Sequence, residues 1–200
     1  LRFRGTSGSS WSGDMCVDDI ALTTTTGGGG GGGNGCTAEV SNFPYGESFE
    51  SGTGGWSQVS GDDLNWTRDS GGTPSSGTGP STGSSGSWYM YIEASGNNTG
   101  YPNKNAIFES PCFDLRNASS ASFNFAYHMY SSGSTGDVGE LEVLISTNDG
   151  NSWNSLGSIS GSQGNAWQNA TASLDNYVGN TVRLRLSGTT ANTWRGDIAV

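Results

Sequence analysis

The stretch Ser122-Phe123-Asn124-Phe125-Ala126-Tyr127-His128-Met129-Tyr130 decides the fold class. Its aromatic residues at 123, 125 and 127 fall on one face and the residues between them on the other, because side chains alternate along an extended strand. Similar apolar bursts occur at residues 141–145 and 182–186, each bounded by Gly, Asn, Asp or Ser. Short alternating strands separated by turn residues are typical of an all-β sandwich.

About ten strands are expected, and almost no helix, because no stretch has a convincing 3.6-residue apolar period. Residues 70–87, rich in Gly, Ser, Thr and Pro, are expected to form a long loop, and residues 148–151 a hairpin turn. This number of strands suits two packed antiparallel sheets. We expect the strands in these ranges: 46–50, 56–59, 64–68, 88–93, 105–110, 122–130, 140–146, 153–159, 167–174, 181–187 and one opening at 198.

Composition limits the classes of partner. The 200 residues carry a net charge of −10 with eight Lys and Arg, so a nucleic-acid backbone would be repelled. Anionic membranes are disfavoured for the same reason, and no apolar run is long enough to span a bilayer. The Asn, Thr and Gly richness and the acidic surface suit an extracellular, exported protein.

The three cysteines are Cys16, Cys36 and Cys112, so at most one internal pair can form. In an exported protein, a Cys36–Cys112 disulfide would staple the start of the main domain to a strand edge. Two buried free thiols are the alternative. The role of Cys16 stays open.

An internal repeat sets the domain boundaries. Residues 1–6 match residues 184–189, and the match continues without a gap from Trp11-Ser12-Gly13-Asp14 against Trp194-Arg195-Gly196-Asp197 to Val17 against Val200. Residues 1–22 are therefore expected to be the closing hairpin of a preceding repeat. Residues 23–35, with four threonines and seven consecutive glycines, are expected to be a flexible linker. The main domain would span residues 36–200 and stop inside its last strand.

A lone hairpin is marginally stable in water, so residues 1–22 need a partner to be ordered. One hypothesis is strand exchange, in which this segment completes a sheet of its own domain or of a neighbouring molecule. The alternative is a proteolytic or crystal-packing remnant. The absence of any ladder to another strand would exclude exchange.

Nine fragments occur here in the order in which a known module carries them. The fragments are Phe49-Glu50, Asp63-Leu64-Asn65-Trp66-Thr67-Arg68, Thr73-Pro74 with Thr78-Gly79-Pro80, Tyr91-Ile92-Glu93-Ala94-Ser95, Ser110-Pro111, Tyr127-His128-Met129-Tyr130, Val138-Gly139-Glu140-Leu141, residues 161–167 and Gly196-Asp197-Ile198-Ala199-Val200. With these fragments the sequence resembles the MAM domain family over residues 36–200, and residues 1–22 resemble the end of a second copy.

The resemblance implies an extracellular jelly-roll-like sandwich used for adhesion and assembly, as in meprin-type proteases, neuropilins and receptor tyrosine phosphatases. Cys36 sits where the family's first cysteine does, but the second is absent and Ser122 occupies a later cysteine position. Cys112 is extra. This departure puts the animal disulfide pattern in doubt and looks more like bacterial secreted versions.

The sequence contains no arrangement of residues that is typical of a catalytic site. The single histidine, His128, lies within an alternating strand, where a packed or half-exposed histidine is expected. Glycosidase-type carboxylate pairs could be drawn from Glu93, Asp137, Glu140 and Glu142, but solvated strand charges are the simpler interpretation. We expect no enzyme.

A structural cation is the favoured site hypothesis. Glu50, Asp62, Asp63 and Asp197 would converge if the first and last strands meet, and like charges need a counter-ion. Hard oxygen ligands select Ca²⁺, or Na⁺ more weakly. Separate salt bridges or N–H contacts are the alternative.

Aromatic residues suggest a rival function. Most tryptophans and tyrosines should be core, but Trp88, Tyr89 and Tyr91 share one strand, so some could face a ligand. The first interpretation is a non-catalytic module that binds a protein partner or self-associates through a sheet edge or the N-terminal hairpin. The alternative is a carbohydrate-binding accessory domain of a secreted enzyme, with a polysaccharide as ligand.

Overall fold

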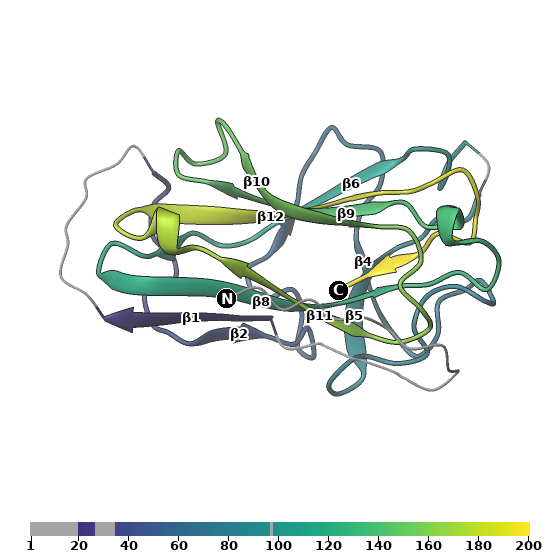
Figure 1. The fold of residues 1–200 in the computed structure, drawn as a ribbon, viewed down its shortest axis with the longest axis horizontal. Helices are drawn as coiled ribbons and strands as arrows, with labels where there is room; N and C mark the ends of the chain where they lie inside the picture. Colours follow the sequence, from purple (N-terminus) through teal and green to yellow (C-terminus); the bar gives the residue numbers. More distant parts are fainter. Residues whose placement is uncertain (1–19, 27–34, 97) are drawn as a thin grey trace.

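A computed structural model describes residues 20–26, 35–96 and 98–200. Two antiparallel sheets lie face to face, as the upper and lower layers of Figure 1 show. The expected two-sheet all-β sandwich is confirmed. In the described residues the strands are β1 (Ile20–Thr26), β2 (Tyr45–Glu47), β3 (Ser57–Gln58), β4 (Thr67–Ser70), β5 (Trp88–Ile92), β6 (Asn105–Glu109), β7 (Phe113–Asp114), β8 (Ala118–Met129), β9 (Glu140–Ser146), β10 (Asn154–Ser160), β11 (Gln168–Ser173), β12 (Thr181–Thr189) and β13 (Ile198–Ala199).

Helix is confined to two short 3₁₀ turns in the described ranges, η1 (Thr135–Asp137) and η2 (Asp175–Tyr177). None of the helices in these ranges is long and apolar enough to cross a membrane.

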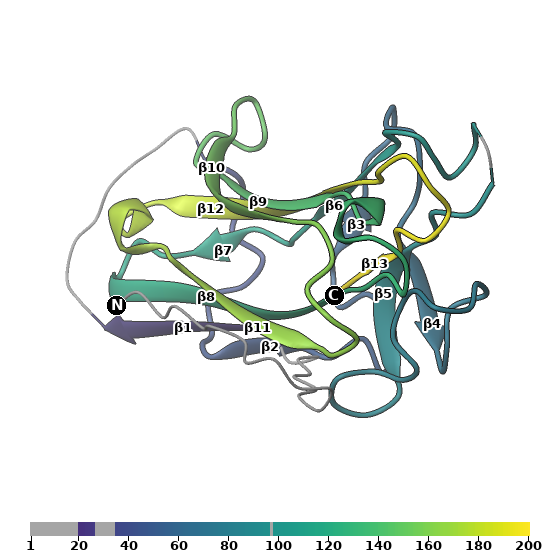
Figure 2. The ribbon, with the colours of Figure 1, turned by 45° about the vertical axis from the view of Figure 1, so that its right-hand side comes forward.

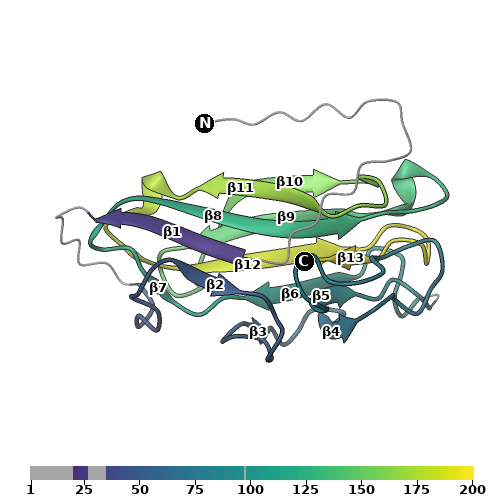
Figure 3. The same cartoon turned by 90° about the horizontal axis from the view of Figure 1, so that it is seen from below.

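The first sheet has the order β2-β1-β8-β13-β5-β4, with β11 on the other edge of β8. The second has the order β10-β9-β12-β6-β3, with β7 also paired to β12. Figure 2 shows both layers from a second angle, and Figure 3 shows β2, β1, β8 and β11 side by side in the first sheet. Strand β8 is therefore the centre of the first sheet, because β11, β1 and β13 all pair with it.

The core lies between the sheets and follows the predicted alternation. From the first sheet, Phe123, Phe125 and Tyr127 belong to the main buried cluster. From the second sheet come the alternating apolar residues of β9 and β12, and β12 alternates half-buried and buried positions along its whole length. Each large apolar side chain removed from water contributes about 1.5–3 kcal/mol, so this layer is the main stabilising feature.

A second, smaller apolar cluster forms on the outer side of the first sheet. It contains Tyr89, Tyr91, Ala126, Trp167 and Ala199. The loop before β5 covers it, since the Trp167 indole N–H donates to Thr82 O (2.9 Å) and the Tyr89 hydroxyl to Gly71 O (2.9 Å). The predicted loop at residues 70–87 is thus an ordered cover over aromatic residues.

The N-terminal segment departs from the expected boundaries. Thr23–Thr26, predicted to begin the linker, belong instead to β1. They gain backbone hydrogen-bond partners along β8, where Thr23 lies opposite Ser122 and Thr25 opposite Ser120. Threonine also favours strands, because its branched Cβ suits a pleated surface. The rest of the predicted hairpin (1–19) and of the linker (27–34) lies outside the described residues.

Candidate functional site

The four carboxylates predicted to hold a cation accept hydrogen bonds from three different parts of the backbone: Glu50 at the start of β5, Asp62 and Asp63 at β6, and Asp197 just after β5. Glu50 accepts hydrogen bonds from the backbone N–H groups of Ser87 and Trp88, both at 2.7 Å. These two bonds hold the pKa of Glu50 below its usual value. Glu50 therefore fixes the start of β5.

Asp62 and Asp63 lie in the turn before β4 and support β6. Asp62 Oδ2 accepts from the Ile107 N–H (2.7 Å), and Asp63 Oδ2 accepts from the Asn105 N–H (3.0 Å). The Lys104 ammonium lies 3.7 Å from Asp63 Oδ1. Both carboxylates thus satisfy donors at the edge of the second sheet.

Asp197 lies at the other end of β5 from Glu50. Its Oδ1 accepts from the Ala94 N–H (2.9 Å), whereas Glu50 binds at Trp88. Six residues of extended chain separate these two positions, which is about 20 Å at the rise of a strand. The structure therefore does not bring Glu50 and Asp197 together, and no group of three or more Asp, Glu, His and Cys side chains in the described ranges could hold a metal ion.

Asp197 has a different acidic neighbour, Glu93. In the β13–β5 ladder Ile198 lies opposite Ile92, so the residues just outside it, Asp197 and Glu93, face each other. Asp197 is fully buried, and burial together with the Glu93 charge raises its pKa to about 7. Glu93 Oε2 and Asp197 Oδ2 are both buried without a hydrogen-bond partner. Like charges placed opposite each other repel, so this pair is suited to share a proton or a cation.

Thr78, from the covering loop, closes this site. Its hydroxyl accepts from the Asp197 N–H (3.1 Å) and lies within hydrogen-bonding distance of Tyr130 O (3.1 Å) and Arg195 O (3.0 Å). The sequence indicated Asp197 through its place at the closing strand, which was expected to meet the first strand. It gave no signal that Glu93 would be the partner, because that pairing depends on the β13–β5 register.

The aromatic residues proposed to face a ligand do not form an exposed platform. Tyr89 and Tyr91 are buried in the outer cluster, with relative exposures of 0% and 4%. Trp88 is half-buried, and the Arg68 guanidinium lies 3.6 Å from its ring centroid. The prediction for Tyr89 and Tyr91 is corrected here, because the loop before β5 folds over the face on which they stand.

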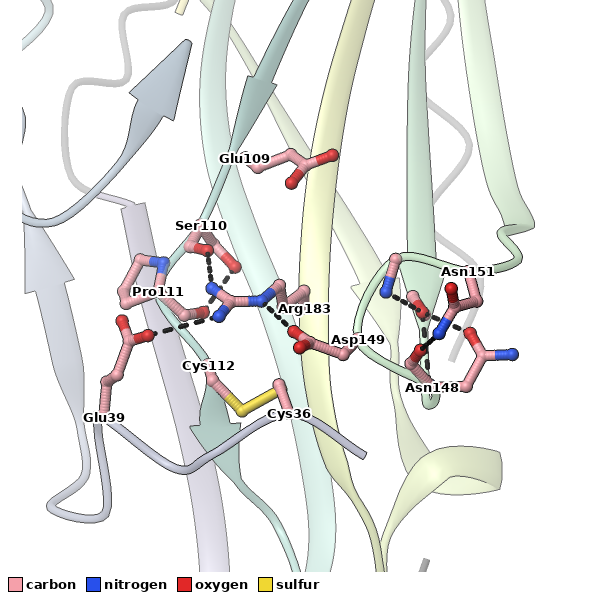
Figure 4. Close-up of polar contacts among 12 residues, drawn as sticks. Cys36, Glu39, Glu109, Ser110, Pro111, Cys112, Asn148, Asp149, Asn151 and Arg183 are labelled. Atoms are coloured by element: carbon pink, nitrogen blue, oxygen red, sulfur yellow. Dashed lines mark hydrogen bonds and ion pairs between the residues drawn. A yellow bond between two sulfur atoms is a disulfide. The ribbon is translucent and has the colours of Figure 1, made fainter. Parts of the chain in front are cut away.

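The predicted Cys36–Cys112 disulfide is present, with Cα atoms 6.0 Å apart. Beside it, Arg183 on β12 makes three contacts, shown in Figure 4. Its guanidinium donates to Asp149 (2.8 Å), to Glu39 (3.2 Å) and to the backbone carbonyl of Ser110 (3.1 Å). The disulfide and this arginine together fasten the start of the main domain to the second sheet.

Among the residues considered for catalysis, His128 and Asp137 make contacts that hold the fold together. His128 is buried, with its ring 5.7 Å from the Trp167 ring and its Nε2 3.3 Å from Asn165 Oδ1. The Asp137 carboxylate caps η1 by accepting from the Ser134 N–H (2.9 Å), which lowers its pKa. His128 thus packs against an aromatic ring, and Asp137 caps a 3₁₀ turn.

An open groove lies where β9, β10 and β12 meet the loops at one end of the sandwich. Its volume is about 620 Å³. Glycine, small polar residues and Glu140 line most of it, from η1, the ends of the strands and residues 189–192. Ligand pockets of this size usually have apolar and aromatic walls, and this groove has no aromatic residue.

Fold and sites together define a disulfide-stapled, two-sheet antiparallel β-sandwich module. The family model for the MAM domain (meprin/A5/mu) matches residues 48–200, and the chain belongs to this family. Among solved structures, the K2 cleaved adhesin domain of Lys-gingipain is similar at 17% identity and a TM-score of 0.52, over 76% of this chain and 90% of that one. The K3 cleaved adhesin domain from Porphyromonas gingivalis w83 has 19% identity and a TM-score of 0.49, over 76% and 89%.

Proposed function

We propose that this chain is a non-catalytic extracellular module that makes protein–protein or cell-surface contacts within a multi-domain secreted protein. The match of residues 48–200 to the MAM family carries the proposal. The adhesin domain that shares the fold supports it, as does the structural use of the buried histidine and carboxylates. The acidic net charge of −10 favours partners with basic surfaces.

A protein-binding array tests this function. The full chain, with its disulfide intact, is applied to an array of extracellular proteins that includes the chain itself. We expect binding that is lost when the chain is reduced and unfolded. If the folded chain binds nothing that the unfolded chain does not bind, the proposal is wrong.

Carbohydrate binding is the alternative, and the polar groove is one candidate place for it. Sugar-binding sites stack pyranose rings on exposed aromatic faces, whereas Tyr89 and Tyr91 are buried. A polysaccharide in this groove, beside Glu140 and Thr189, would be held by hydrogen bonds without aromatic stacking. A glycan array should therefore show no ligand, and a hit weakened by Glu140→Gln would support the alternative.

We also propose a structural cation, Ca²⁺ or more weakly Na⁺, at the pair Glu93 and Asp197. Two buried carboxylate oxygens without hydrogen-bond partners fit a hard cation, which prefers oxygen ligands. Further oxygen ligands would have to come from backbone carbonyls, hydroxyl groups or water, since Ca²⁺ takes about six to eight. The cation would remove the repulsion between the two carboxylates.

Calcium titration tests the cation. A ligand of the native state raises the melting temperature as its concentration increases. We expect Ca²⁺ to stabilise the wild-type chain and the Asp62→Asn variant, but not Asp197→Asn. An equal response of Asp197→Asn and the wild type would exclude this site.

A further inference from the structure

Strand β1 lies on the edge of β8 next to β13, in the positions that, by the internal repeat, correspond to the chain following the Gly-Asp motif at residues 196–197. It is inserted between β2 and β8 and runs antiparallel to both. Strand β13 pairs with the same edge of β8 a few residues further along and is also antiparallel to it. β1 and β13 therefore run in the same direction along one edge, and Figures 1 and 3 show the C-terminus close to the start of β1.

The sequence repeat explains this alignment. Residues 14–17 match residues 197–200, and the first copy continues directly into β1. The segment that follows the Gly-Asp motif in the first copy thus fills the edge positions that follow the same motif in the second.

The register agrees to within one residue. Ala199, which matches Cys16, lies opposite His128, and Ala21 lies opposite Asn124. The first copy advances five residues from Cys16 to Ala21, whereas β8 advances four from His128 to Asn124. A single β-bulge accommodates a difference of one residue.

We infer that the β8 edge between β13 and residue 118 is a strand-acceptor site, and that the segment Ile20–Thr26 of a second copy of this chain can fill it. The inference deepens the proposed function, because it names one partner of the module as another copy of the same repeat. A donated strand from each copy to the next would link repeats head to tail.

The contacts of β1 favour exchange over a permanent attachment. Leu22 is fully buried and belongs to the main core. A β8 edge without a bound β1 would therefore leave a cavity in the core. Ala21 and Thr24 are only half-buried and Thr23 is exposed. Among residues 21–24, whose burial the structure describes, Leu22 is the one fully buried side chain, so β1 is held mainly by this side chain and by its ladders to β2 and β8, and its local opening should cost less than global unfolding.

The disulfide limits where an acceptor can lie. Cys36 stays tied to Cys112 of its own domain while β1 leaves. Nine residues lead from Thr26 to Gly35, and an extended chain covers about 30 Å over that length. The accepting copy must therefore dock close to the donating one, as neighbouring repeats would.

Disulfide trapping between full-length chains tests the exchange. Thr23 Oγ1 and Ser122 Oγ lie 3.0 Å apart across the β1–β8 pair. Chains carrying Thr23→Cys are mixed with chains carrying Ser122→Cys, all in a Cys16→Ser background. After oxidation, mass spectrometry of isotope-labelled chains counts disulfides between positions 23 and 122 of different molecules.

The matched control replaces Ser122→Cys by Thr171→Cys. Thr171 is exposed on β11, opposite Asn124 on the other edge of β8. We expect at least about tenfold more crosslinking for the 23–122 mixture, because an aligned pair reacts much faster than a colliding one. A chain carrying both Thr23→Cys and Ser122→Cys should form the bond internally, which verifies the geometry.

Equal crosslinking in the two mixtures, with the internal bond formed in the double variant, would overturn the inference and show that β1 pairs only with its own domain. A double variant that forms the 23–122 bond neither within a chain nor between chains would also overturn it, since β1 would then not lie on β8. Neither result would affect binding to the other proteins of the array, so failure of the exchange and failure of the proposed function are distinguishable.

Discussion

Asp197 carries a carboxyl group where an ionised one is poorly solvated. The side chain is fully buried, opposite Glu93, and its Oδ2 has no hydrogen-bond partner. Burial raises its pKa to about 7. Near neutral pH, the protonation state of Asp197 therefore changes the free energy of unfolding of the chain.

The raised pKa predicts a pH dependence of stability. A folded-state pKa above the unfolded value of 3.8 means that the native chain binds this proton more tightly. The resulting stabilisation is complete below about pH 4 and is lost as the pH rises through about 7. In calcium-free buffer, acidification from pH 7 to 4 should therefore stabilise the wild type relative to Asp197→Asn by on the order of a few kcal/mol.

Urea unfolding of both chains at several pH values measures this difference. The comparison with Asp197→Asn removes the opposite contributions of carboxylates with lowered pKa values, such as Asp114 and Asp175, which both chains share. A stability difference that stays constant from pH 4 to 7 would show that Asp197 keeps its ordinary pKa.

At the scale of elements, β1 shows how the partner decides whether a segment is ordered. Its four terminal threonines follow the pattern of a linker, yet they extend the ladder with β8 as far as Thr26 opposite Ala118. Strand β8 in turn begins at Ala118, four residues before the predicted start. Each strand supplies the backbone partners that the other needs, so neither boundary is a property of one segment alone.

Leu22 is predicted to hold β1 in place. Leu22→Ala should destabilise the chain by about 2–4 kcal/mol, because it removes a fully buried side chain from the core and leaves a cavity. The matched variant Thr23→Ala, next to it but exposed, should change the stability by less than about 1 kcal/mol. Urea unfolding measures both, and equal effects would mean that β1 adds nothing to the core.

At the scale of the whole molecule, the chain is closed at two places far apart in sequence. The disulfide joins Cys36 to Cys112 across a separation of 76 residues, and Arg183 adds ion pairs to Glu39 and Asp149 (Figure 4). The other closure is β13, which ties the end of the chain to β5 and β8. The disulfide restricts the unfolded chain, because it is covalent, whereas the β13 pairing holds the end of the chain only in the folded state.

Removing the disulfide should lower the free energy of unfolding by about 2–4 kcal/mol, because a crosslink over a long loop restricts the unfolded state. The test compares the double variant Cys36→Ser/Cys112→Ser with the wild type in thermal unfolding. Cys16→Ser is the control, since it removes a cysteine without touching the bond. An unchanged melting temperature in the double variant would contradict the prediction.

The sequence by itself determined the fold class and the position of most strands, and it favoured the Cys36–Cys112 pair that the structure then showed. The alternation of apolar and polar residues over 122–130 can be read from that segment alone, because it shows which face of the strand is turned to the core. Only the tertiary structure decided that Glu93 meets Asp197, that Tyr89 and Tyr91 lie under a loop, and that Thr23–Thr26 join a sheet. These features depend on register and on contacts between distant segments, and no local pattern encodes which strands become neighbours.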